Sequence, residues 1–196
     1  MPITQKHGHK IGEEIRSPAY IDANFLVYYS VGSYLVPDLQ TVARNVMGDL
    51  LAQGVSILVS LVSVEEAWWA TLEELFCRHI WQSPPTGEQC RLNRKKAHSN
   101  WAQLMLYRSE VEKIVENLQE LRNHGADIRF VPEVGDAFEV CHNAPNLMEK
   151  HSLFSADALH LSLALSQAKT LITFDVGDFK TVADPDQDLT IMLLTS

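Results

Sequence analysis

Short apolar runs alternate with longer amphipathic stretches along most of the chain. Runs of apolar and β-branched residues predict buried strands over residues 19–22, 55–61, 128–131, 171–174 and 191–194. Between them, apolar residues that recur every three or four positions predict helices over residues 37–53, 64–78, 99–124, 136–150 and 155–168. Strands that alternate with helices predict an α/β fold, in which helices flank a central parallel sheet of about five strands.

The length fits one domain with added segments. A chain of 196 residues suggests a single domain that needs neither a disulfide nor a zinc ion to stabilise it. Residues 1–16 are polar and charged, and they predict a flexible segment ahead of a domain over residues 17–196. Prolines and a glycine predict a loop over residues 82–90, which begins a helical elaboration around residues 82–124. Pro145 predicts an interruption of the helix over 136–150.

Composition bears on compartment and partners. Three cysteines, Cys77, Cys90 and Cys141, form no CxxC pair, which favours buried thiols in a reducing compartment over a disulfide framework or a zinc ribbon. Nothing in the sequence predicts a secretory signal or a membrane span, so we expect a cytoplasmic protein with no membrane partner. The net charge of −9 argues against a general nucleic-acid binder, because phosphate binding needs cationic surface.

Acidic residues stand where predicted strands end and predicted helices begin. Asp22 and Asp175 follow strands, Glu66 and Asp157 begin helices, and Asp178 comes three residues after Asp175. Open α/β sheets bind ligands beyond the carboxyl ends of their strands, so we expect these side chains to converge at one edge. Carboxylates held close together repel one another unless they are protonated or bind cations. Because Mg²⁺ and Mn²⁺ prefer oxygen ligands, the pattern predicts a site for one of them.

Ordinary roles in caps and turns remain open for the same residues. Ser63 and Glu66 have the spacing of a capping box, which would account for Glu66 without any chemistry. A lone Asp after a strand is usually a turn or cap residue, and Asp178 fits a simple Asx-turn. Only the joint pattern of the four acids favours the metal site.

Four stretches resemble, in order, the motifs of the PIN-domain family, the Mg²⁺-dependent ribonuclease fold of VapC-like toxins. They are Tyr-Ile-Asp-Ala-Asn-Phe-Leu at 20–26, Ser-Leu-Val-Ser-Val-Glu-Glu-Ala at 60–67, Ala-Asp-Ala-Leu-His-Leu-Ser-Leu-Ala at 156–164, and Leu-Ile-Thr-Phe-Asp-Val-Gly-Asp-Phe at 171–179. The family's spacing selects Glu66 over Glu65. The resemblance spans residues 19–194 and implies a PIN-like three-layer fold.

The resemblance also implies a chemistry and a set of residues. It implies that the catalytic carboxylates, which hold one or two Mg²⁺ or Mn²⁺ ions, are Asp22, Glu66, Asp157 and Asp175. Supporting roles are implied for Asp178 as an accessory acid, Asn24 beside the first Asp, and Thr173 as an orienting hydroxyl. The implied reaction is hydrolysis of RNA phosphodiester bonds by an endoribonuclease. The implied partners are RNA, a cognate antitoxin and a second copy of the chain.

Several further features have both a functional and a structural interpretation. A basic run could contact RNA phosphates or could simply be a solvated helix start: Arg91, Arg94, Lys95 and Lys96. The tryptophans could stack on bases but are more often packing residues. His160 lies one turn after Asp157, where it could support the site or pack as a neutral core residue.

Two other classes of function compete with the nuclease. A PIN-fold module could bind RNA or protein without cutting it. A phosphatase of the haloacid-dehalogenase type would need an Asp-x-Asp pair after the first strand, and Asn24 stands where the second Asp would be. No phosphate-binding glycine loop of the common kinds occurs in the sequence.

Overall fold

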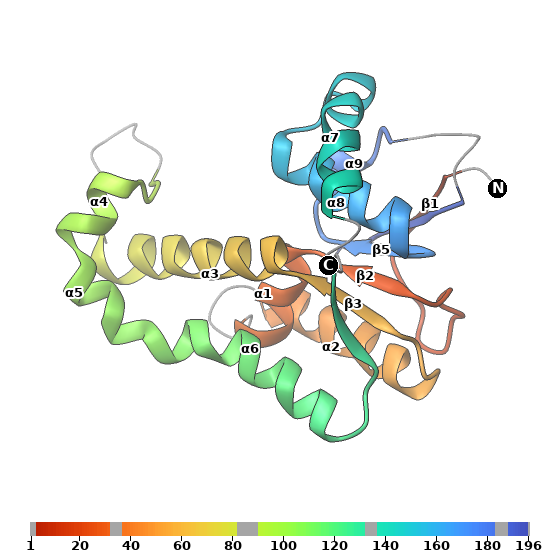
Figure 1. Ribbon diagram of the computed structural model, residues 1–196. Helices are drawn as coiled ribbons and strands as arrows, with labels where there is room; N and C mark the ends of the chain where they lie inside the picture. The colour runs from red at the N-terminus through yellow and green to blue at the C-terminus, as the bar shows by residue number, and fades with distance from the viewer. Residues whose placement is uncertain (1–2, 32–36, 82–89, 132–136, 183–187, 196) are drawn as a thin grey trace.

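Six parallel strands form the centre of the protein, in the order β1-β6-β5-β2-β3-β4 (Figure 1). The structure is a computed structural model that describes residues 3–31, 37–81, 90–131, 137–182 and 188–195. The strands are β1 (Thr4–His7), β2 (Ala19–Ile21), β3 (Ile57–Ser60), β4 (Ile128–Val131), β5 (Thr170–Thr173) and β6 (Thr190–Leu193). This confirms the predicted α/β class with a parallel sheet, and it adds one edge strand to the five that were expected.

The added strand, β1, lies inside the segment that was expected to be flexible. It pairs in parallel with β6, with Thr4 opposite Thr190 and His7 opposite Leu193. The Gln5 side chain donates hydrogen bonds to the carbonyl oxygens of Phe179 and Val182, at 3.1 and 2.9 Å. Because β1 is polar in sequence, no apolar run marks it, and only its pairing with β6 makes it a strand.

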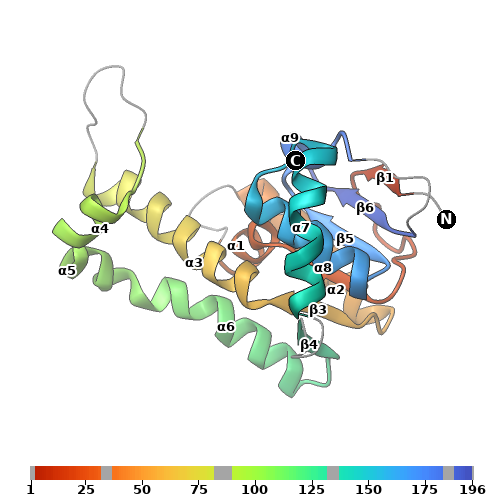
Figure 2. The same cartoon turned by 45° about the horizontal axis from the view of Figure 1, so that its top comes forward.

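Helices cover both faces of the sheet, which gives three layers (Figure 2). On one face lie α1 (Ala23–Val31), α2 (Pro37–Ala52), α3 (Leu61–Leu75) and α6 (Arg108–Asn123). On the other face lie α7 (Ala137–His151) and α8 (Ser155–Gln167), and the short α9 (Val176–Phe179) follows β5. Successive strand residues enter the two cores in turn: Ile21 packs with the first group and Tyr20 with the second. Pro145 lies inside α7 and does not interrupt it, contrary to the prediction.

α3 and α6 run side by side away from the sheet and form a helical arm (Figures 1 and 2). The end of the arm consists of a π-helical turn η2 (Phe76–Ile80), α4 (Arg94–Ser99), α5 (Trp101–Leu104) and a 3₁₀ turn η3 (Met105–Tyr107). These elements enclose a small core of their own, made of Leu72, Phe76, Leu92, Ala97 and Leu104. The single helix predicted over 99–124 is therefore wrong: the chain turns at Asn100 and again at η3 before α6 begins. Most of the predicted loop at 82–90 lies outside the described residues.

Cys77 and Cys90 form a disulfide bond at the end of the arm. The prediction of three buried thiols is wrong for this pair, and also for Cys141, which is free but exposed. The number and spacing of cysteines do not say which of them meet in space. Here Cys77 and Cys90 meet because both pack against the arm's core.

Among the described helices, none has the length and apolar character that crossing a membrane requires.

Candidate metal centre

The candidate site lies at the carboxyl ends of β2 and β5, in the middle of the sheet. β2 pairs with β3 on one side and β5 on the other, and the chain builds the sheet in opposite directions from this point. Such a switch in strand order opens a crevice at the carboxyl edge, where α/β proteins bind ligands. Asp22 directly follows β2, and Asp175 lies two residues beyond β5.

Three aspartates come together directly in this crevice. One carboxylate oxygen from each of Asp157, Asp175 and Asp178 lies within 4.8 Å of the other two. Asp157 is in the first turn of α8, and Asp175 caps α9 by accepting a hydrogen bond from the Asp178 backbone N–H at 3.1 Å. Asp178, expected only as an accessory acid, therefore stands in the central cluster. Capping and clustering coexist here, because the cap of α9 uses only Oδ1 of Asp175.

Asp22 lies beside this cluster and is almost fully buried. Its Oδ1 accepts a hydrogen bond from the Phe25 backbone N–H at 2.9 Å, so it caps α1. Burial raises its pKa to about 6, against the lowering effect of the Thr173 hydroxyl, and the nearby Asp175 raises it further. Thr173 Oγ1 in turn accepts a hydrogen bond from the Asp175 backbone N–H at 2.8 Å. Thr173 thus connects Asp22 to Asp175.

The site carries more negative charge than its surroundings compensate. Burial raises the pKa of Asp157 to about 6, and the charges of Asp178 and Asp175 raise it further. Burial and Asp175 also raise the pKa of Asp178. A set of hard oxygen donors that resist joint ionisation suits a small divalent cation, which relieves the repulsion. The residues therefore fit the Mg²⁺ or Mn²⁺ that the motifs imply.

Glu66 reaches the site by a route that its sequence position did not predict. Helix α3 begins at Leu61, and Ser60 caps it by accepting a hydrogen bond from the Ser63 backbone N–H at 2.9 Å. The proposed capping box of Ser63 and Glu66 is wrong, because β3 passes straight into α3 and the first hydroxyl available is that of Ser60. Glu66 is instead free to reach across to α8, where its Oε2 lies 2.6 Å from His160 Nε2.

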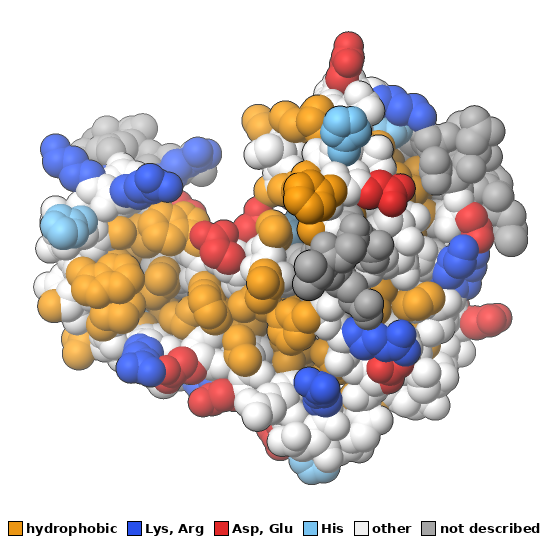
Figure 3. Space-filling view, in the orientation of Figure 1, with side chains coloured by type: hydrophobic (Ala, Val, Ile, Leu, Met, Phe, Trp, Pro, Cys, Tyr) orange, Lys and Arg blue, Asp and Glu red, His pale blue; other side chains and the backbone are white. Residues whose placement is uncertain are grey.

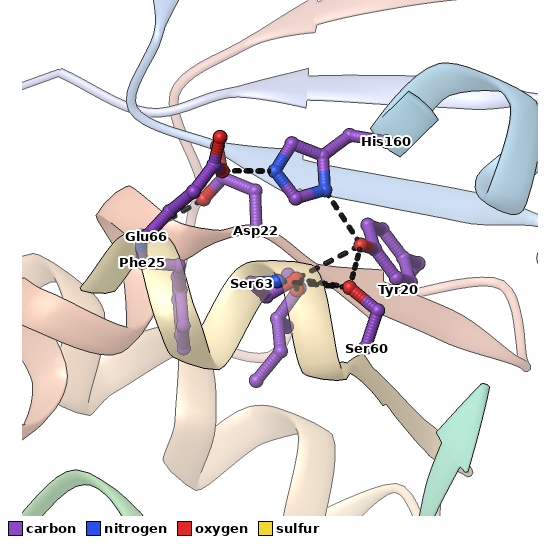
Figure 4. Close-up of polar contacts among 8 residues, drawn as sticks. Tyr20, Asp22, Phe25, Ser60, Ser63, Glu66 and His160 are labelled. Carbon is purple, nitrogen blue, oxygen red and sulfur yellow. Dashed lines mark hydrogen bonds and ion pairs between the residues drawn. The ribbon is translucent and has the colours of Figure 1, made fainter. Parts of the chain in front are cut away.

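A buried polar network lies beneath Glu66 (Figure 4). His160 Nδ1 lies 2.6 Å from the hydroxyl of Tyr20, which in turn is 2.8 Å from the hydroxyls of both Ser60 and Ser63. Sequence reasoning missed Tyr20, although one signal was present: Tyr20 stands two residues before Asp22, and side chains two positions apart along an extended chain point to the same side. His160 was noticed only for its spacing from Asp157.

A groove of about 690 Å³ leads from the site along α3 to the end of the arm. Its lining residues are Ala23, Asn24, Glu65, Glu66, Trp69, Ala70, Glu73, Asn93, Arg94 and Asp157. Figure 3 shows acidic side chains in the hollow between arm and body, and Lys and Arg side chains gathered at the end of the arm. Asn24, expected near the first Asp, is part of this lining.

The predicted basic run divides into two parts. Arg91, Arg94 and Lys95 are exposed, and Arg94 lines the groove. Lys96 is half-buried: its Nζ lies 3.5 Å from the centre of the Trp81 ring and donates a hydrogen bond to the Arg91 carbonyl oxygen at 3.1 Å. Lys96 therefore packs within the arm, whereas the other three side chains are open to solvent.

No protein-family model matches the chain, and no curated protein matches it. Among solved structures, the chain is similar to a crystal structure of VapBC2 from Rickettsia felis bound to a DNA fragment from their promoter. The identity is 17%, the match covers 89% of this chain and 97% of that chain, and the TM-score is 0.41. A likeness at this level supports no conclusion about activity, so any functional conclusion rests on the residues of the site.

Proposed function

We propose that the protein is a metal-dependent endoribonuclease of the PIN-domain kind, which hydrolyses RNA phosphodiester bonds at the carboxylate site. The observation that carries the proposal is the convergence of Asp157, Asp175 and Asp178 beside the buried Asp22, at the switch point of a parallel sheet. These acids come from motifs spread over more than 150 residues of sequence, and ordinary capping does not require them to meet.

Five carboxylates are available to hold Mg²⁺ or Mn²⁺: Asp22, Glu66, Asp157, Asp175 and Asp178. Asp157, Asp175 and Asp178 form the central ligand set, and Asp22 and Glu66 approach it from β2 and α3. When bound, such a cation acts as a Lewis acid that activates water and stabilises the charge of a phosphoryl transition state. Thr173 and Asn24 support the arrangement, Thr173 through its contacts with Asp22 and Asp175.

The groove along α3 is the proposed path of the RNA strand. Its floor is acidic, so phosphates are expected to follow the rim, where Arg94 stands beside the exposed Arg91 and Lys95. Trp69 lines the groove between Glu66 and Arg94 and offers a face on which a base can stack. With a net charge of −9, binding away from this path is expected to be weak and metal binding to be needed for affinity.

Cleavage assays on purified protein test the proposal. Wild-type protein is expected to cut single-stranded RNA in Mg²⁺ or Mn²⁺ and not in EDTA, and Asp22→Asn is expected to abolish cutting. Asp38→Asn, which changes an exposed aspartate at the start of α2, is the matched control and is expected to cut normally. Undiminished cutting by Asp22→Asn overturns the proposal. Metal binding without cutting by the wild-type protein favours the non-catalytic RNA- or protein-binding module.

We further propose a homodimer and a cognate antitoxin as protein partners. Two exposed apolar residues of α3 support a protein contact: Leu61 and Trp68 lie two turns apart on one face, with 73% and 40% of their surfaces exposed. Light scattering on the wild-type protein and on Leu61→Asp tests the dimer. A monomeric mass for the wild-type protein rejects it.

A further inference from the structure

We propose that His160 and Tyr20 are positioning residues of the metal site, which hold the Glu66 carboxylate in one orientation. In this arrangement one Glu66 oxygen is committed to His160 and the other remains available to the cation. The inference rests on the proposed function, because it assigns Glu66 to the ligand set. It concerns residues that the motifs do not assign to any role in the reaction.

The first step concerns the imidazole, whose two nitrogens both have partners. His160 is 3% exposed, and its Nε2 lies 2.6 Å from Glu66 Oε2 while its Nδ1 lies 2.6 Å from the Tyr20 hydroxyl (Figure 4). An ionised carboxylate can only accept, so Nε2 carries the proton that is donated to Glu66. In the neutral ring Nδ1 then accepts from the Tyr20 hydroxyl. Rotating the ring would break both bonds, so its orientation is fixed.

The second step concerns the anchor beneath the imidazole. Tyr20 is fully buried in β2, and its hydroxyl contacts Ser60 and Ser63, both at 2.8 Å. A phenol keeps its proton at neutral pH, so the Tyr20 hydroxyl can donate to Nδ1 of His160. Ser60 caps α3 and Ser63 lies in its first turn, and the same helix carries Glu66 about one turn later. The network thus runs from β2 to α8 and returns to Glu66 on α3.

The third step concerns why the Glu66 carboxylate needs a hydrogen-bond donor to keep it oriented toward the site. Its side chain has three rotatable bonds, is 30% exposed and lines the open groove. Its charge adds to the repulsion at Asp157, so without a donor the carboxylate would gain by turning toward solvent. His160, on the same helix as Asp157, supplies that donor from within the core. Residues that orient metal ligands in this way typically contribute ten- to hundredfold to metal affinity or activity.

A matched set of variants tests the proposal, with Mn²⁺ affinity measured by calorimetry and RNA cleavage measured as kcat and KM. His160→Leu is expected to weaken Mn²⁺ binding and lower kcat by about ten- to hundredfold, with little change in KM. Tyr20→Phe keeps the ring and its packing, and we expect a smaller loss of about tenfold or less. His160→Gln places an amide donor near the position of Nε2 and is expected to restore most of the Mn²⁺ affinity that His160→Leu loses.

Two controls separate positioning from general stability. His9 forms a second buried pair, with Nε2 2.6 Å from Asp49 Oδ2, so His9→Leu removes an equivalent contact away from the site. It is expected to lower the unfolding midpoint but to leave Mn²⁺ affinity and kcat unchanged. Tyr29→Phe, on α1, controls for loss of a tyrosine hydroxyl.

The outcomes distinguish this inference from the proposed function. If the wild-type protein binds Mn²⁺ but cuts no RNA, the nuclease proposal fails, and reduced Mn²⁺ affinity of His160→Leu still supports the positioning role. If cleavage depends on Asp22 while His160→Leu and Tyr20→Phe bind Mn²⁺ like the wild-type protein, the positioning role is wrong and the nuclease stands. Equal losses in His160→Leu and His160→Gln also overturn the positioning role, because the donor would then be irrelevant.

Discussion

Two histidine–carboxylate pairs with the same 2.6 Å contact occur in this protein, and their surroundings differ. His9 pairs with Asp49 and ties the N-terminal segment to α2, and the Gly12 backbone N–H donates a second bond to the same oxygen at 2.8 Å. These donors lower the pKa of Asp49. His160 pairs with Glu66 at the edge of a cluster in which burial and like charges raise the pKa of Asp22 and Asp157.

The comparison teaches that the bond itself does not identify a functional site. In the first pair both donors to the carboxylate come from the N-terminal segment, and the contact simply joins that segment to α2. Among the described residues, Nδ1 of His9 has no hydrogen-bond partner, whereas Nδ1 of His160 is held by Tyr20. In the second pair Tyr20 orients His160 from beneath, and Glu66 faces a cluster of like-charged carboxylates. This is the arrangement expected of a residue that binds a cation.

The largest difference between the pairs is expected in catalysis. Glu66→Gln should lower the kcat of RNA cleavage by about a hundredfold, because a ligand charge is lost and the remaining oxygen coordinates weakly. Asp49→Asn should leave kcat unchanged while lowering the urea midpoint. Cleavage kinetics and urea titrations on the two variants provide the comparison. Equal kcat values for the two variants would show that the pairs do not differ in role.

The contributions of Asp22 and Asp49 to the free energy of unfolding should change with pH in opposite directions. For Asp22, the pKa of about 6 in the folded protein exceeds the ordinary value of 3.8, so the folded state prefers the protonated form. Its contribution to stability is complete below about pH 4 and is lost as the pH rises through about 6. For Asp49 the pKa is lowered, so its contribution is present above the ordinary value and is lost as the pH falls below it.

Asp22→Asn should therefore stabilise the metal-free protein while abolishing its activity. The raised pKa corresponds to an upper limit of about 3 kcal/mol at pH 7.5, and an asparagine can still cap α1. Urea unfolding in EDTA between pH 4.5 and 7.5 measures the effect. A variant that is less stable than the wild-type protein at pH 7.5 would contradict the assignment of uncompensated charge to this site.

Divalent cations should stabilise the protein through the carboxylate site beside Glu66 and not through the His9–Asp49 pair. At a Mg²⁺ concentration of about 100 times Kd, binding to the folded state adds roughly 2.7 kcal/mol to the free energy of unfolding. The rise in Tm on adding Mg²⁺ should persist in Asp49→Asn and disappear in Asp175→Asn. Scanning calorimetry with and without Mg²⁺ provides the measurement. A rise of the same size in both variants would place the cation elsewhere.

The smallest effect is expected when an arginine beside the groove is compared with an arginine far from it. Arg94→Ala should raise the KM for RNA about three- to tenfold with little change in kcat, and it should reduce the slope of log KM against log salt by about 1. Arg16→Ala, which breaks an ion pair with Asp188 away from the groove, should leave KM unchanged. Steady-state kinetics at several salt concentrations compare the two. A larger effect of Arg16→Ala would reject the groove as the RNA path.

Much of this arrangement could be predicted from local pattern. The apolar runs locate five of the six strands, and the rule for parallel sheets places Asp22 near Asp175 from the sequence alone. The support of Glu66 could not be predicted in this way, because Tyr20 and His160 are 140 residues apart and nothing local links them. The same holds for the disulfide and for β1. All three features depend on which segments, distant in the sequence, lie next to each other in the fold. The periodicity of apolar residues carries no information about those contacts.

The separate core at the end of the arm has a consequence for cooperativity. Leu72, Phe76, Leu92, Ala97 and Leu104 bury little surface compared with the two clusters that sandwich the sheet. Regions with small cores open locally at lower free energy than the whole protein unfolds. We therefore expect the end of the arm, which bears Arg94, to exchange its amide hydrogens before the sheet and the helices that cover it. A long polymer could enter such a groove sideways, without having to be threaded from one end.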